Sequence, residues 1–276
     1  MGSNPTFFEK YGPWAIVTGA ASGLGKEFTN QIAAHKINDC AIDVQADKLR
    51  EQVIFLREQY GVNAQELVVD LAQPDFLDVV VEGVADAEIG LLANVAGLSY
   101  VGECLDLPLA HLRKQVAVNC DAPLTLAHHF GQQMRTRRRG GLIFLSSASA
   151  YQGTALVANY AATKAYNLIL AEGLWDELRS FGVDVLGFAP GATNTPGFHK
   201  DNPQYKAIAM PYMEPGPTVS EALAALGKMP SRIAGGSNRA AALLTGRLLT
   251  RKRTIMLFGD NMRKLYGHRL AKQGRI

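Results

Sequence analysis

Hydrophobic and polar positions alternate along most of the chain in a pattern that predicts strands and helices in turn. Short apolar runs predict buried strands at 14–17, 40–42, 67–69, 90–92, 142–145 and 183–188. Apolar residues at helical spacing predict helices at 23–34, 48–59, 75–85, 109–135, 158–180 and 219–226. Such an alternation needs right-handed crossovers, so it predicts a doubly wound α/β fold whose mostly parallel sheet carries helices on both faces.

The length of the chain favours one domain with two additions. The 276 residues, 47% of them hydrophobic, can form one large core, so a single domain over residues 1–276 is expected. Five prolines interrupt the aperiodic stretch 191–218, which we expect to form a substrate lid. Residues 237–276 are expected to form a C-terminal extension.

Charge is distributed unevenly between this extension and the rest. The net charge is +3, but residues 247–276 contain nine Lys or Arg and one acid, Asp260, which gives +8 there and −5 elsewhere. The extension is therefore either a solvated surface segment or a contact for an anionic group on a substrate or a partner subunit. A nucleic-acid partner is not expected, because the basic segment is short and interleaved with apolar residues.

Several features favour a soluble, cytoplasmic protein without a membrane partner. Cys40, Cys104 and Cys120 are too few for a disulfide framework and lack metal-ligand spacing, so we expect them to be reduced and mostly buried. The N-terminus shows no charged-then-apolar leader, and no run of about eighteen apolar residues could span a bilayer. The six histidines lack ligand spacing as well, so no metal site is expected.

A glycine-rich turn follows the first predicted strand. Gly19, Gly23 and Gly25 let the chain turn sharply into a helix and let backbone N–H groups approach a pyrophosphate at the positive end of that helix. Ser22 and Leu24 lie in the same turn and are further candidates for this contact. A glycine turn alone is a weak signal, but a strand precedes this one and a helix follows it, as in Rossmann-like dinucleotide-binding folds.

Acidic residues at two later strand ends bear on the choice of cofactor. Asp43 ends the second predicted strand eighteen residues after Gly25, where a carboxylate can accept hydrogen bonds from an adenosine ribose. Its negative charge would repel the 2′-phosphate of NADP. The next residue, Val44, is not the Arg or Lys that would neutralise such a phosphate, so NAD is the expected cofactor. Asp43 could instead be an ordinary strand-end turn residue. Asp70, followed by Leu71, could face the adenine or start the next turn.

Ser147, Tyr160 and Lys164 form a candidate proton-transfer set. Tyr160 and Lys164 lie one helical turn apart on one face. A nearby ammonium, aided by an oxidised nicotinamide, can supply the roughly 4 kcal/mol that brings a tyrosine pKa from about 10 to about 7. Tyr160 would then exchange a proton with a substrate oxygen that Ser147 orients, while hydride moves to or from the cofactor. Each residue alone has an ordinary structural explanation, but the set together with the glycine turn does not.

Over residues 14–234 the chain resembles the short-chain dehydrogenase/reductase family. Besides the motifs above, Asn94-Val95-Ala96-Gly97 resembles the family's Asn-Asn-Ala-Gly segment. Val95 replaces the second asparagine, which weakens any side-chain contribution at that position. The resemblance implies that Asn94, Ala96 and Gly97 contact the cofactor.

Three further features extend this resemblance. Asn119 occupies the place of a helix asparagine that holds a water between the lysine and solvent, so it is expected to complete the proton relay. Pro190 and Gly191, followed by Thr195, resemble the loop whose threonine binds the nicotinamide carboxamide. The family also implies homodimers or homotetramers that pack through the two long helices.

Weaker matches concern the substrate. Residues 10–14 and 226–235 resemble bacterial 7β-hydroxysteroid dehydrogenases and related long-chain 3-oxoacyl reductases. This implies a bulky hydrophobic secondary alcohol or ketone, such as a hydroxysteroid or an aromatic alcohol, as substrate. One alternative is a 3-hydroxyacyl thioester such as an acyl-CoA, and another is a catalytically silent dehydrogenase-fold subunit or nucleotide sensor. Apolar lid residues that could line a pocket, or simply pack, are Phe198, Tyr205, Met210, Tyr212 and Met213.

Overall fold

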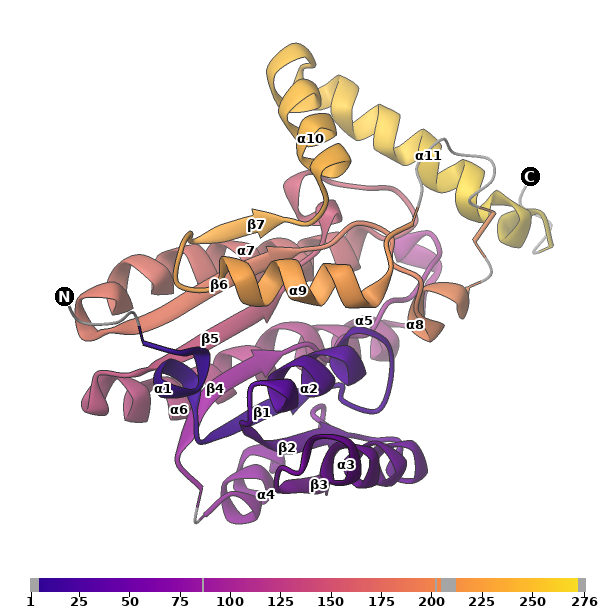
Figure 1. The fold of residues 1–276 in the computed structure, drawn as a ribbon. Helices are drawn as coiled ribbons and strands as arrows, with labels where there is room; N and C mark the ends of the chain where they lie inside the picture. Colours follow the sequence, from indigo (N-terminus) through magenta and orange to yellow (C-terminus); the bar gives the residue numbers. More distant parts are fainter. Residues whose placement is uncertain (1–4, 86, 202, 205–211, 273–276) are drawn as a thin grey trace.

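The computed structural model describes residues 5–85, 87–201, 203–204 and 212–272. At its centre lies a seven-stranded sheet with the strand order β3-β2-β1-β4-β5-β6-β7, in which all neighbouring strands are parallel (Figure 1). The strands are β1 Trp14–Thr18, β2 Asn38–Asp43, β3 Ala64–Val68, β4 Ile89–Asn94, β5 Gly140–Leu145, β6 Val183–Ala189 and β7 Ser231–Ile233. The predicted doubly wound α/β fold is confirmed, and every predicted strand overlaps an observed one.

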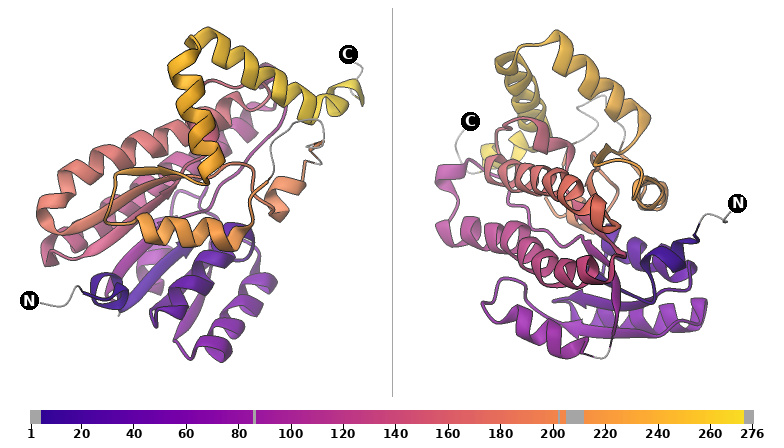
Figure 2. Two further views of the ribbon diagram at one scale, coloured as in Figure 1. Left: turned by 45° about the horizontal axis from the view of Figure 1, so that its top comes forward. Right: turned by 90° about the vertical axis from the view of Figure 1, so that its left-hand side faces the viewer.

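Helices cover both faces of the sheet (Figure 2). Apolar side chains of α2, α3 and α9 share one core cluster with the sheet, whereas those of α4, α6 and α7 share the other. The helices are α1 Phe7–Tyr11, α2 Gly23–Ala34, α3 Ala46–Tyr60, α4 Phe76–Gly83, α5 Leu109–Val116, α6 Ala122–Arg137, α7 Ala158–Leu178, α8 Pro196–His199, α9 Pro215–Ala225, α10 Gly236–Leu248 and α11 Arg251–Lys272. Successive strand residues point to opposite faces, so the neighbours Ile16 and Val17 belong to different clusters.

The stretch predicted as one helix over 109–135 is divided in the structure. One wider turn with π-helical hydrogen bonding, Ala117–Asp121, joins α5 to α6. Inside it, Oδ1 of Asn119 accepts a hydrogen bond from the backbone N–H of Leu98 at 2.8 Å, and its Nδ2 donates to the Leu98 carbonyl at 3.0 Å. The apolar period continues through this turn, so periodicity could not reveal it. Such π turns are frequent at functional sites.

One helix lies within the region predicted as a lid, and a second begins in it. The short helix α8 begins after Thr195, and α9 begins at Pro215 rather than at Val219. Proline is favoured in the first turn of a helix because its missing N–H is not needed there. The lid candidates Tyr205 and Met210 lie outside the described residues.

The C-terminal extension consists of α10 and α11, which leave the body as an arm (Figures 1 and 2). The distal half of α11 returns to the body, where Leu265 and Tyr266 are buried against Leu156. Val101 packs on the same cluster. Because Val101 follows β4 and Leu156 follows β5, the arm rests on two loops at the carboxyl edge of the sheet.

All three cysteines are free, but they differ in exposure. Cys40 is buried in β2, whereas Cys104 and Cys120 are half-buried, so the expectation of mostly buried cysteines is wrong for these two. The reason is their position, since Cys104 lies in a surface turn and Cys120 in the π turn. Within the described ranges, no helix is long and apolar enough to cross a bilayer, and no group of three His, Cys, Asp or Glu is placed to hold a metal ion.

Candidate active site

The glycine-rich turn connects β1 to α2 at the carboxyl edge of the sheet. Gly19 has a φ of +73°, and a methyl group there would lie 2.9 Å from the Cα of Ala96. A methyl group on Gly25 would lie 1.9 Å from the carbonyl oxygen of Gly19. Both positions therefore require glycine. Ser22 is the N-cap residue of α2 but makes no side-chain capping bond, and Leu24 packs on the core, so the first N–H groups of α2 remain available to an anion.

Asp43 ends β2, as predicted, and faces this turn. Its Oδ2 accepts a hydrogen bond from the N–H of Ala21 at 3.1 Å, and its Oδ1 accepts one from the N–H of Gln45 at 3.0 Å. These bonds fix the carboxylate beside the glycine turn. Lys48 is connected to it indirectly, because the Lys48 Nζ donates to the Gln45 Oε1 at 2.9 Å and the Gln45 Nε2 contacts Asp43.

Asp70 lies two residues beyond the end of β3 and starts a turn. Its Oδ1 accepts a hydrogen bond from the N–H of Ala72 at 3.0 Å, and its carbonyl oxygen accepts one from Gln73 at 2.9 Å. The ion pair with Lys114 of α5, at 2.9 Å, holds the pKa of this carboxyl below its ordinary value. Asp70 thus starts a turn, and its contact with the adenine stays a prediction. Leu71 is buried in the core, and its contact with a cofactor stays a prediction.

The segment after β4 crosses above the glycine turn. The Thr18 hydroxyl oxygen, at the end of β1, accepts hydrogen bonds from the N–H groups of Val95 and Ala96, each at 3.0 Å. Asn94 is only 2% exposed, and neither its amide nitrogen nor its amide oxygen has a partner among the described residues. Leaving such a buried group unpaired costs about 1–3 kcal/mol. A polar ligand at this edge would therefore meet an unpaired donor and acceptor.

Ser147, Tyr160 and Lys164 come together where β5 meets α7. The Ser147 hydroxyl acts on the Tyr160 phenol by lowering its pKa, and it accepts a bond from the N–H of Ser149 at 3.2 Å. The Lys164 Nζ lies 5.8 Å from the centre of the Tyr160 ring and donates to the carbonyl oxygen of Leu145 at 2.8 Å. The three predicted catalytic side chains therefore form one cluster.

The protonation equilibria in this cluster differ from the sequence-based expectation. Burial lowers the pKa of Lys164 to about 8. Burial also raises the pKa of Tyr160, and the hydrogen bond with Ser147 offsets this only in part. The expected lowering of the phenol pKa is thus absent from the chain alone, because the desolvation that disfavours the phenolate also disfavours the ammonium that would stabilise it. An oxidised nicotinamide, when bound, would add its positive charge to that of Lys164 in stabilising a phenolate.

Gly97 joins the segment after β4 to the catalytic cluster. A methyl group on Gly97 would lie 3.2 Å from the Lys164 Nζ and 3.6 Å from the Asn119 Oδ1. The Nδ2 of Asn119 also donates to the Thr163 hydroxyl at 3.0 Å, and that hydroxyl donates to the Tyr160 carbonyl at 2.8 Å. Asn119 therefore lies beside the lysine, as predicted, and both hydrogens of its amide are used to join neighbouring segments.

The loop after β6 borders both halves of the site. The carbonyl oxygen of Pro190 accepts a hydrogen bond from the N–H of Ala148, which follows Ser147 in the chain, at 2.8 Å. Thr195 caps α8, and a methyl group on Gly23 would lie 3.2 Å from its Cβ. Pro190 and Thr195 thus connect the segment that carries Ser147 to the glycine turn, and the contact of Thr195 with the nicotinamide stays a prediction.

Sequence reasoning missed three residues that position this site. They are Thr18, described above, Ser146 and Asn238. The Ser146 hydroxyl donates to the Lys164 carbonyl at 2.7 Å, and the Asn238 amide of α10 lies against Gly191. Thr18 and Ser146 each end or follow an apolar strand at the carboxyl edge, where parallel sheets collect binding residues, and this signal could have identified them. Asn238 carries no comparable signal.

A phosphate-binding turn, an acid at the end of β2 and a Ser-Tyr-Lys cluster define a class of nicotinamide-dependent oxidoreductases. Residues 13–206 match the family model of the short chain dehydrogenases. The chain therefore belongs to the short-chain dehydrogenase/reductase family.

Individual relatives and solved structures show which members of the family this chain is similar to. A 7β-hydroxysteroid dehydrogenase of Clostridium sardiniense is 30% identical over 84% of this chain and 89% of its own length. The human very-long-chain 3-oxoacyl-CoA reductase is 31% identical over 65% of this chain and 59% of its own. A 7β-hydroxysteroid dehydrogenase structure is 29% identical and superimposes with a TM-score of 0.87 over 92% of this chain and 99% of that chain. A short-chain dehydrogenase of Sphingobium yanoikuyae in complex with NADPH is 25% identical, with a TM-score of 0.75 over 85% and 93%.

Proposed function

We propose that this protein is an NAD-dependent dehydrogenase/reductase that interconverts a secondary alcohol and a ketone on a bulky hydrophobic substrate such as a hydroxysteroid. The observation that carries the proposal is the cluster of Ser147, Tyr160 and Lys164 beside Gly97. In it, Tyr160 exchanges the proton with the substrate oxygen, and Ser147 orients that oxygen. Lys164, held by the Leu145 carbonyl, stabilises the phenolate.

The residues at the carboxyl edge fit a nicotinamide dinucleotide. Gly19 and Gly25 keep the turn free of side chains, and the unpaired amide of Asn94 offers a buried donor and acceptor. Asp43 would accept from the adenosine ribose, and Thr195 would bind the carboxamide. When bound, the cofactor supplies the hydride acceptor or donor. The fixed Asp43 carboxylate disfavours a 2′-phosphate, which supports NAD over NADP.

The apolar surroundings of the cluster support a bulky hydrophobic substrate. Leu156 lies between the catalytic serine and tyrosine in sequence, and it packs with Leu265 and Tyr266 of α11. Val101 and Met262 join the same cluster. The arm thus adds buried apolar packing to the segment between Ser147 and Tyr160. The hydroxysteroid dehydrogenase among the relatives favours a steroid-like substrate for this chain.

A substrate panel tests the proposed activity. Incubation with NAD and hydroxysteroids, 3-hydroxyacyl thioesters or aromatic secondary alcohols, with NADH absorbance as readout, should give the highest kcat/KM for a hydroxysteroid. We expect the kcat/KM for the hydroxysteroid to exceed that for the thioester by at least about tenfold, because a pocket that matches one substrate in shape and polarity discriminates against others to that degree. The highest value for a thioester would favour the 3-oxoacyl reductase alternative, which the human relative supports. No turnover of any compound would favour a silent subunit or nucleotide sensor.

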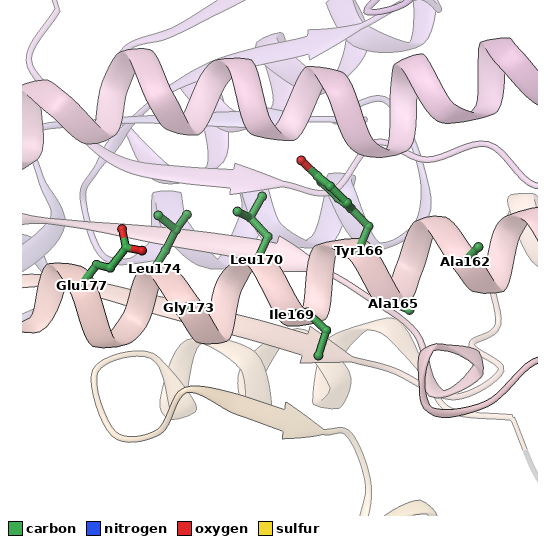
Figure 3. A pocket seen from close by; sticks show the side chains of 8 residues that line it. All are labelled: Ala162, Ala165, Tyr166, Ile169, Leu170, Gly173, Leu174 and Glu177. Atoms are coloured by element: carbon green, nitrogen blue, oxygen red, sulfur yellow. The ribbon is translucent and has the colours of Figure 1, made fainter. Parts of the chain in front are cut away.

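We also propose a homodimer or homotetramer, in the cytoplasm, that assembles through α7. The outer face of this helix carries a shallow apolar hollow formed by Tyr166, Ile169, Leu170, Gly173 and Leu174 (Figure 3). Ile169 is 66% exposed in the single chain. A contiguous apolar face of this kind is typical of subunit interfaces. The free thiols are in keeping with a reducing compartment.

Ile169→Glu should weaken the assembly on the order of 100-fold, because the variant would bury an unpaired carboxylate at the interface. Analytical ultracentrifugation over a dilution series would show the shift to smaller species. Ile54→Glu is the matched control, since Ile54 is 45% exposed on α3, away from this face. An unchanged mass for Ile169→Glu would exclude α7 as the interface.

A further inference from the structure

The junction of α10 and α11 is the part of the arm that projects farthest from the sheet (Figures 1 and 2). The arm is fastened at its base, where Glu221 of α9 accepts hydrogen bonds from Arg232 and from the N–H of Gly235, each at 2.8 Å. Glu221 also pairs with Arg239 of α10. Among the described residues, no ion pair joins the junction of α10 and α11, the tip of the arm, to the body.

The tip is strongly basic. Residues 236–259 contain no acid. Arg247, Arg251, Lys252 and Arg253 are all exposed around the junction, and none of these four side chains pairs with an acid among the described residues. Four unneutralised cations at one projecting point create a local positive potential that attracts a polyanionic surface.

Large apolar side chains are exposed between these cations. Leu248 is 73% exposed, Leu244 is 56% exposed and Met256 is 57% exposed. Exposing several such side chains together is unfavourable in water, so they require an apolar environment to cover them. Lys and Arg side chains next to exposed leucines on a helix are typical of segments that lie at the boundary between lipid headgroups and acyl chains.

We propose that the α10–α11 tip, residues 244–256, docks on the surface of an anionic lipid bilayer. The cations would contact the headgroups, while Leu244, Leu248 and Met256 would enter the acyl boundary. A second copy of the chain is the less favoured occupant, because the tip is convex and mixes charge with apolar groups, whereas the α7 face offers a continuous apolar surface. The sequence-based expectation of no membrane partner considered spanning segments, and this contact is peripheral.

Docking would also orient the body. The arm extends from the tip to the apolar cluster of Leu156, Leu265 and Tyr266, which borders the catalytic segment. A bilayer held at the tip would therefore be joined to the catalytic segment through the arm. This consequence rests on the proposed function, whereas bilayer binding itself does not.

Vesicle co-sedimentation of the full chain tests the proposal without any turnover. We expect binding to vesicles of phosphatidylcholine mixed with phosphatidylglycerol, little binding to phosphatidylcholine alone, and release at high salt. Lys252→Glu should weaken the partition coefficient about tenfold or more, since each cation near an anionic surface contributes several-fold. Leu248→Ser should weaken it by roughly tenfold through the lost apolar burial.

Matched controls lie at the opposite edge of the sheet, on α3. Lys48→Glu changes charge as Lys252→Glu does, and Ile54→Ser removes an exposed apolar side chain as Leu248→Ser does. Both controls should bind vesicles like the unmodified chain. Absence of binding to anionic vesicles, or equal losses in the control variants, would overturn the proposal. A lower sedimentation mass of Leu248→Ser without vesicles would assign the tip to a second copy instead.

Discussion

Tyr160→Phe should lower kcat/KM for the alcohol or ketone about 10³-fold while cofactor affinity changes little. The substitution removes only the phenolic oxygen, whose pKa the Ser147 hydroxyl lowers, from a ring whose centre lies 5.8 Å from the Lys164 Nζ. The ring, the helix and the Lys164 bond to Leu145 remain. Steady-state turnover and fluorescence titration with NADH would measure the two quantities separately.

Tyr166→Phe is the matched control. It removes the same oxygen from the same helix, but Tyr166 lies on the outer face of α7 and is 39% exposed. Turnover should therefore stay within about twofold of the unmodified enzyme. Unchanged turnover of Tyr160→Phe would refute the assignment of the proton-transfer residue. A parallel loss of NADH affinity in that variant would mean that the phenol acts mainly in cofactor binding.

Asp43→Asn should shift the ratio of kcat/KM for NAD over NADP by about 100-fold toward NADP. The reason is electrostatic, because a carboxylate about 4 Å from a phosphate at an effective dielectric constant of about 20 contributes several kcal/mol of repulsion per charge. The asparagine keeps an acceptor for one of the two N–H groups, from Ala21 and Gln45, that hold the side chain. Initial rates with each cofactor at saturating alcohol would provide the ratio.

Asp47→Asn separates this local effect from the general loss of a negative charge. Asp47 is exposed in the first turn of α3, four residues beyond Asp43, and its substitution should leave the ratio nearly unchanged. A preference of the unmodified chain for NADP would show that Asp43 does not select the cofactor. Lys48, which reaches Gln45 at 2.9 Å, would then be the cation to examine as a phosphate ligand.

The sheet was predictable because its strands are parallel and covered on both faces, so they appear as continuous apolar runs. The run 142–145, for example, lies within β5. The edge strand β7 was missed because Ser231 and Arg232 break that pattern. The π turn at Asn119 was missed for a different reason, since long-range bonds to Leu98 hold it and local spacing contains no information about them.

The site was predictable where a motif fixes backbone geometry or chemistry. Gly19 and Gly25 have no room for a side chain, so the glycines in the sequence predict the position of the turn. The pKa of Tyr160 was not predictable from the Tyr-Lys spacing, because burial of both groups opposes the attraction between them. How much each group is desolvated depends on the packing of the whole cleft, which sequence spacing does not describe.

Lys164 is attached to β5 by both its side chain and its backbone. These two bonds fix α7 against β5, whereas the other side of the cleft has no such constraint from Lys164. Its side chain donates to Leu145, and its backbone carbonyl accepts from Ser146, so α7 is locked to β5 on either side of the amine. A hinge that widened the cleft between these two elements would break both bonds. If a bulky substrate binds, the cleft would therefore have to widen on the side opposite these two bonds, and the position of Lys164 relative to β5 would stay the same.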